Sequence, residues 1–83
     1  MLSLPAPVRI HILIGLACFE TPETVVTSVK EKFGLTLSRQ RVEAHNPERA
    51  AGARLGVQWR DLFYDARQRY LKELADIPLA HKA

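Results

Sequence analysis

The sequence has one cysteine, few aromatic residues and no internal repeat or low-complexity segment, and each shortage excludes something. A single cysteine, Cys18, allows no intramolecular disulfide and no cysteine cluster that could hold zinc. Three Phe, two Tyr and one Trp are the only large aromatic anchors available to a core in 83 residues. A chain of this length buries only about 60% of its unfolded surface, so oligomerisation is a reasonable expectation.

Residue patterns that support catalysis or cofactor binding are missing as well. The histidines at positions 11, 45 and 81 stand on separate predicted elements and have no metal-ligand spacing. The glycines form neither a phosphate-binding loop nor a dinucleotide fingerprint. Asp61 and Asp65 alternate with arginines, a pattern that favours surface ion pairing over acid–base chemistry. We therefore predict a protein that is not an enzyme and has no catalytic residue, cofactor or metal.

The one apolar run, ILIGLACF at residues 12–19, is too short to span a bilayer. Because it contains Cys18, it superficially resembles a bacterial lipoprotein signal. The segment before it carries two prolines and a single arginine, and Gly15 stands where such a signal usually has leucine. We expect a cytoplasmic protein without a membrane partner.

The positive charge is concentrated in one block of the chain. Residues 1–38 and residues 61–83 each carry as many acidic as basic side chains, so both segments are neutral. Residues 39–60 carry five arginines against Glu43 and Glu48, which accounts for the whole net charge of +3. Arginine offers a rigid fork of donors that fits phosphate and guanine edges. Charge alone favours equally a nucleic-acid binding patch and a solvated helix face.

Apolar residues recur at helical spacing, and no stretch alternates as a strand would. A helix at about residues 7–19 is apolar nearly all round, which predicts burial on two sides or a subunit contact. Thr21 and Pro22 begin a second helix that Gly34 ends, and Ser38 caps a third that runs to about His45. The pattern predicts a single all-α domain, a small helical bundle that contains a helix-turn-helix at residues 22–45.

A long helix is expected at about residues 55–76, because one apolar stripe continues from Leu55 to Ile77. The opposite face is expected to hold polar residues: Arg60, Asp61, Tyr64, Arg67, Gln68 and Lys72. At 1.5 Å per residue this helix would be about 33 Å long, more than a body of this size can cover. The part beyond Tyr70 is therefore expected to pair with another subunit through Tyr70, Leu74 and Ile77.

The third helix has the character of a recognition helix, since Val42 is its only strong apolar residue. Arg39 could contact guanine bidentately, and Gln40 suits adenine. The residues expected to contact bases or backbone are Ser38, Arg39, Gln40, Arg41 and His45, with Lys30, Thr36, Arg49 and Arg54 holding phosphates. The competing interpretations are a helical hairpin that only packs, and a protein-interaction module without DNA binding.

Six short motifs in order resemble a family of small phage and prophage proteins of unknown function. They are LACFETPETV, the FG at residues 33–34, SRQRVE, NPERAAG, the W-R-x-L-F of residues 59–63 and the late IPLA. The resemblance covers roughly residues 8–80. The chain departs from the family pattern at residues 46–48, where NPE replaces D-P-T, and at Leu79, which replaces isoleucine.

The resemblance implies a layout similar to that of phage terminase small subunits, with a helix-turn-helix followed by helices that assemble an oligomer. It therefore implies binding of viral double-stranded DNA for packaging in the cytoplasm of a bacterial host. A homo-oligomer and a large terminase subunit are the implied partners. The alternative is a phage or prophage transcription regulator that uses the same motif, and a shared layout does not decide between them.

Overall fold

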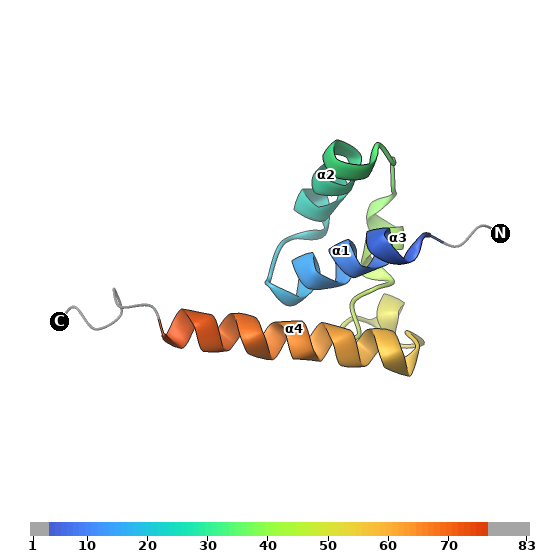
Figure 1. The fold of residues 1–83 in the computed structure, drawn as a ribbon. Coiled ribbons are helices and arrows are strands. Elements are labelled where there is room, and N and C mark those ends of the chain that lie inside the picture. The colour runs from blue at the N-terminus through green and yellow to red at the C-terminus, as the bar shows by residue number, and fades with distance from the viewer. Residues whose placement is uncertain (1–3, 77–83) are drawn as a thin grey trace.

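The computed structural model describes residues 4–76, and this part of the chain is helical without a strand (Figure 1). The elements are α1 (Ala6–Ala17), α2 (Pro22–Phe33), α3 (Arg39–Glu43), the short 3₁₀ turn η1 (Ala50–Gly52) and α4 (Val57–Ala75). The predicted fold class, a small helical bundle with a long C-terminal helix, is confirmed. None of the helices within residues 4–76 is long and apolar enough to cross a membrane.

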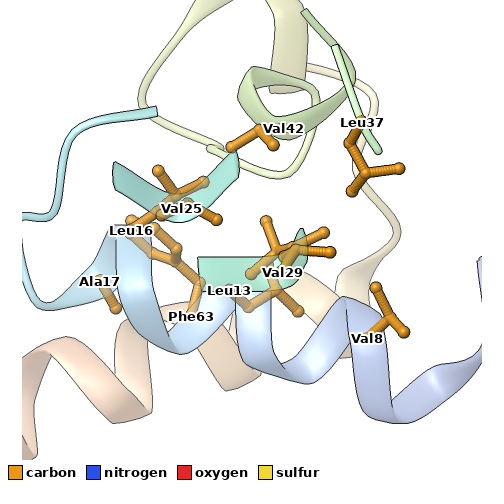
Figure 2. Close-up of a cluster of buried hydrophobic side chains, with 10 residues drawn as sticks. Val8, Leu13, Leu16, Ala17, Val25, Val29, Leu37, Val42 and Phe63 are labelled. Atoms are coloured by element: carbon orange, nitrogen blue, oxygen red, sulfur yellow. The ribbon is translucent and has the colours of Figure 1, made fainter. Parts of the chain in front are cut away.

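The first helix, α1, lies in the middle of the fold, with α2 on one side and α4 on the other (Figure 1). This position explains why α1 is apolar nearly all round, and it confirms the expectation of burial on two sides. The fully or almost fully buried side chains come from all four α-helices and the turn before α3 (Figure 2). They are Val8, Ile12, Leu13, Leu16, Ala17, Val25, Val29, Leu37, Val42 and Phe63.

The second helix, α2, begins and ends where its capping residues predict. The Thr21 hydroxyl accepts a hydrogen bond from the Thr24 backbone N–H at 3.2 Å. At the other end Gly34 takes the left-handed conformation, with φ of 72°, and donates its N–H to Lys30. Val25 and Val29 face inward against α1, as their four-residue spacing predicts.

The third helix, α3, begins as predicted but is shorter than predicted. The Ser38 hydroxyl accepts a hydrogen bond from the Arg41 N–H at 3.1 Å, so Ser38 is the N-cap. The helix ends at Glu43 instead of His45, because the last residues tighten into bonds of the 3₁₀ type. The N–H groups of His45 and Asn46 bond carbonyls three residues back, each at 3.0 Å. Pro47 disfavours a helical conformation at Asn46, which stops the helix there.

The long helix, α4, packs its first half on α1 and extends past the body with its second half (Figure 1). Phe63 is fully buried, which stabilises the fold by about 1.5–3 kcal/mol relative to an exposed ring. Leu71 and Leu74 are 47% and 43% exposed, so the predicted overhang is present. Of the predicted subunit-contact residues, Tyr70 is half-buried, and Ile77 lies outside the described residues.

Two arginines fasten α4 to α1, one near each end of α1. The guanidinium of Arg9 lies over the Trp59 ring, 4.3 Å from its centroid. Arg67 donates from Nε to the Ala17 carbonyl at 2.6 Å. The expectation that Arg67 lies on the outer face of α4 is wrong. Its side chain is 14% exposed, because it lies four residues after Phe63 and therefore on the same side of the helix.

The turn after α1 contains a phenylalanine where a glycine is usual. Phe19 has φ of 68°, and its N–H and that of Glu20 bond the carbonyls of Leu16 and Gly15, each at 3.0 Å. These are the two bonds of a Schellman motif, whose left-handed residue is most often glycine. A bulky residue there costs on the order of 1–2 kcal/mol. The Arg67 guanidinium lies over the Phe19 ring at 4.0 Å, which offsets part of this cost.

Two glycines four residues apart should differ in how well they tolerate alanine. A Cβ on Gly52 would lie 2.0 Å from the backbone oxygen of Asn46, so Gly52→Ala must displace the connection and should destabilise by about 1–3 kcal/mol. A Cβ on Gly56 would make only ordinary contact with Trp59 at 3.5 Å. We expect Gly56→Ala to change the free energy of unfolding by less than about 0.5 kcal/mol. Urea denaturation of both variants tests this pair, and equal losses would contradict the close approach at Gly52.

Candidate nucleic-acid interface

The outer face of α3 is exposed, while its inner face is held by one side chain. Val42 is fully buried, and α3 packs against α2 and η1. The side chains of Ser38, Arg39, Gln40 and Arg41 are all exposed. The thin apolar seam predicted for α3 is therefore present, and its polar residues are on the molecular surface.

Arg39 is exposed, but its guanidinium is engaged by two carboxylates. Its Nη1 lies 2.9 Å from Glu23 Oε2 on α2, and its Nε donates to Glu43 Oε2 at 3.0 Å. The Glu43 hydrogen bond, followed by the charges of Glu23 and Glu43, raises the pKa of Arg39 above its ordinary value. The Arg39 side chain is nevertheless 62% exposed, and ion pairs this exposed are weak and easily exchanged. A phosphate or a guanine edge would have to compete with these carboxylates for Arg39.

His45 was predicted to reach DNA from the outer face of its helix, and the structure places it inside. It is 6% exposed. Its Nδ1 donates to the Arg41 carbonyl at 3.0 Å, and its Nε2 accepts from Arg9 Nε at 3.3 Å. The neutral tautomer with the proton on Nδ1 satisfies both bonds. Because both ring nitrogens have partners within the fold, His45 is removed from the candidate DNA contacts.

Burial lowers the pKa of His45 below its ordinary value of 6.5. The nearby charges of Arg9 and Arg41 act in the same direction, while the hydrogen bond to the Arg41 carbonyl opposes them. The neutral ring is therefore a structural part of the fold, joining the end of α3 to α1. No feature of the sequence marks this role, since Arg9 and His45 lie 36 positions apart.

The remaining predicted contacts are exposed and lie on the turns around α3. Lys30 is in the last turn of α2, and Thr36 is in the connection to α3. Arg49 precedes η1 and Arg54 follows it. Within residues 4–76, neither Arg49 nor Arg54 forms an ion pair. These two guanidinium groups are therefore available to a phosphate without first losing a carboxylate.

A hollow beside the candidate surface mixes charges of both signs. It lies between the end of α1, the start of α2 and the connection after α3, and its charged lining residues are Glu20, Glu43, Glu48, Arg49 and Arg67. Arg67 Nη1 pairs with Glu48 there at 3.2 Å. In the described part of the chain, no group of three or more histidine, cysteine or acidic side chains could hold a metal.

The fold and this surface define a small all-α protein with a basic, solvent-exposed edge built on α3 and η1. Comparison with known proteins places the chain in a family. Residues 1–83 match the family model described as "Uncharacterized conserved protein (DUF2280)", and the protein belongs to that family. No curated protein and no solved structure matches the chain. The resemblance to a family of unknown function is confirmed, while the phage origin and the terminase-like layout stay predictions.

The buried imidazole predicts a loss of stability in mild acid. The unfolded chain takes up a proton near the ordinary pKa of 6.5, whereas folded His45 resists it. Stability should thus be complete above about pH 6.5 and decrease as the pH falls below it, because the unfolded state then binds more protons. Melting temperatures between pH 7.5 and 5 measure this slope.

His45→Gln keeps a donor and an acceptor without a charge that titrates in this range, and it should flatten the slope. His11→Gln is the matched control, since His11 bonds Ser28 at 2.6 Å on the α1–α2 side of the fold. A slope that survives in His45→Gln would show that other groups cause it.

Proposed function

We propose that the protein binds double-stranded DNA through α3, the connection around η1 and the first turn of α4. The observation that carries this proposal is which arginines are exposed and which pack inside the fold. The five arginines of residues 39–60 are all exposed, namely Arg39, Arg41, Arg49, Arg54 and Arg60. Arg9 and Arg67, which lie outside this block, are the ones that pack internally. Five exposed arginines within 22 residues, on α3, on the segment around η1 that contacts it and on the start of α4, are typical of a chain segment that meets phosphates.

Arg49 and Arg54 are proposed as phosphate contacts. They flank η1, where the chain is fixed by the close approach of Gly52 to Asn46 and by the bond from the Glu48 N–H to the Asn46 side chain at 2.9 Å. A fixed backbone positions the Cα atoms of both arginines before binding, so less backbone freedom is lost on contact. Phosphate contacts of this kind set the register of a protein on DNA without reading its sequence.

We propose that the first turn of α3 contacts base edges, mainly through Arg39 and Gln40. α3 has five residues and is about 7.5 Å long, so only its first turn can project into a major groove. A helix this short reaches few base pairs. Arg39 would exchange its carboxylate partners for a guanine edge, and Gln40 would contact an adjacent adenine.

Within the DNA-binding class, two roles are proposed. The first is a factor of phage or prophage origin that is similar to a terminase small subunit and delivers viral DNA to a large packaging subunit. The second is a phage or prophage transcription regulator. The sequence resemblance supports the first, and the exposed arginine surface supports both equally. The mass of the assembly in solution separates them, because a ring of many subunits favours packaging and a dimer favours regulation.

Substituting Arg54 should weaken binding to all DNA sequences alike. Arg54→Ala removes one phosphate contact, so the slope of log affinity against log salt should fall by about 0.9. Arg69→Ala is the matched control, because Arg69 lies on α4 and pairs with Asp65 at 3.0 Å away from the proposed surface. Gel-shift titrations across salt concentrations measure both variants. Equal losses in the two variants would mean that net charge, and not this surface, drives binding.

Removing the carboxylate that holds Arg39 should have the opposite effect. Glu23→Gln frees one side of the Arg39 guanidinium and should tighten specific binding several-fold. Glu31→Gln removes the same charge from the same helix but from a residue without an ion pair in residues 4–76, so it should change affinity less. Arg39→Ala should relax sequence preference in a selection from random DNA. An Arg39→Ala variant that keeps full preference would overturn the role proposed for α3.

A further inference from the structure

The outer side of α4 carries a line of exposed apolar side chains that the fold leaves uncovered. Val57, Tyr64 and Leu71 follow one another at intervals of seven residues, and they are 63%, 38% and 47% exposed. Leu74 is also exposed, at 43%, but it lies 11 residues after Phe63, about three helical turns, and therefore on the side of α4 that faces the body, not in this line. A seven-residue interval places side chains on one side of a helix and is the repeat of helices that pair along their length. We call this line the α4 seam.

The seam has charges of opposite sign beside it. Asp61 and Lys72 are both exposed, and within residues 4–76 neither forms an ion pair. They are 11 residues apart, which is close to three helical turns, so both lie along the same flank of the seam. The negative charge lies toward the start of α4 and the positive charge toward its end.

We propose that a second copy of this chain packs on the α4 seam in the antiparallel direction. With Asp61 of one copy beside Lys72 of the other, Tyr64 lies within two residues of Leu71 of the other copy, about 3 Å along the axis, and each contact occurs twice by two-fold symmetry. In a parallel two-fold pair the same flank of the two helices lies on opposite sides of the contact, so neither Asp61 nor Lys72 would meet its opposite charge. The partner is a second copy of the chain because one seam carries both the negative charge of Asp61 and the positive charge of Lys72 that would pair with it.

The position of α4 allows this pairing without disturbing the core. α4 meets the body through Phe63, Trp59, Leu62 and Ala66, which pack on or near the buried cluster. The seam residues lie outside that cluster and keep their exposure in the folded chain. At 19 residues the helix is about 28 Å long, enough for several interlocking turns with a partner helix. The pairing does not rest on the proposed DNA binding.

Sedimentation of the full chain over a range of concentrations tests the pairing. The wild type should form a dimer, and Leu71→Glu should raise the dissociation constant by more than tenfold, because it places a charge in the apolar seam. Ile14→Glu is the matched control, since Ile14 on α1 is as exposed as Leu74, at 43%, but lies away from α4. A wild type that stays monomeric, or a Leu71→Glu variant that still pairs, would overturn the proposal.

A charge exchange tests the antiparallel direction itself. Asp61→Lys and Lys72→Asp should each weaken the dimer, and the double variant Asp61→Lys/Lys72→Asp should recover most of the affinity. Because both sites are exposed, all three variants should fold, which circular dichroism checks. A double variant weaker than either single variant would reject the antiparallel arrangement. Arg54→Ala should leave the dimer intact, so failure of the pairing and failure of DNA binding are separate results.

Discussion

The burial of α1 is the constraint on which the other elements depend. Among residues 4–76, α1 supplies five of the ten buried hydrophobic side chains, from Val8 to Ala17, so it must be covered on two sides. α2 covers one side with Val25 and Val29, and α4 covers the other with Phe63. In an 83-residue chain with few aromatic residues, no second core could replace this one. The position of α3 follows from this three-helix arrangement, because α3 packs against α2 and its Val42 side chain is buried in the same core.

Arg9 and Arg67 add hydrogen bonds, aromatic contacts and an ion pair to this core, which apolar side chains could not supply. Arg67 donates to the Ala17 carbonyl, lies over the Phe19 ring and pairs with Glu48. These contacts link α4 to the end of α1 and to the connection after α3. Arg9 joins the Trp59 ring to the buried His45. Both side chains cover apolar surface with their aliphatic stems and planar guanidinium groups, while their charged atoms keep partners. Both cations are more deeply packed than the exposed arginines proposed to serve DNA, among which Arg39 also pairs with Glu23 and Glu43.

The features that could be predicted from the sequence are those decided by neighbours along the chain. Thr21, Gly34 and Ser38 set the ends of α2 and the start of α3 through bonds that span at most four residues. The partners of His45 and Arg67 are distant in sequence, although the inward side of Arg67 follows from its place four residues after Phe63 and could have been predicted. Arg9 lies 36 positions from His45, and Ala17 lies 50 positions from Arg67. The engagement of Arg39 by Glu23 was missed for the same reason, since it depends on how α2 and α3 cross.

The proposed pairing of α4 bears on the choice between the two DNA-binding roles. A seam that is complementary to itself joins like surfaces, so the contact closes at two copies and leaves no free half to extend a ring. An antiparallel pair would also set the first turns of the two α4 helices, each with an exposed Arg60, roughly 30 Å apart at 1.5 Å per residue. The proposed pairing therefore adds support to the proposed two-fold regulator, while both DNA-binding roles stay proposals.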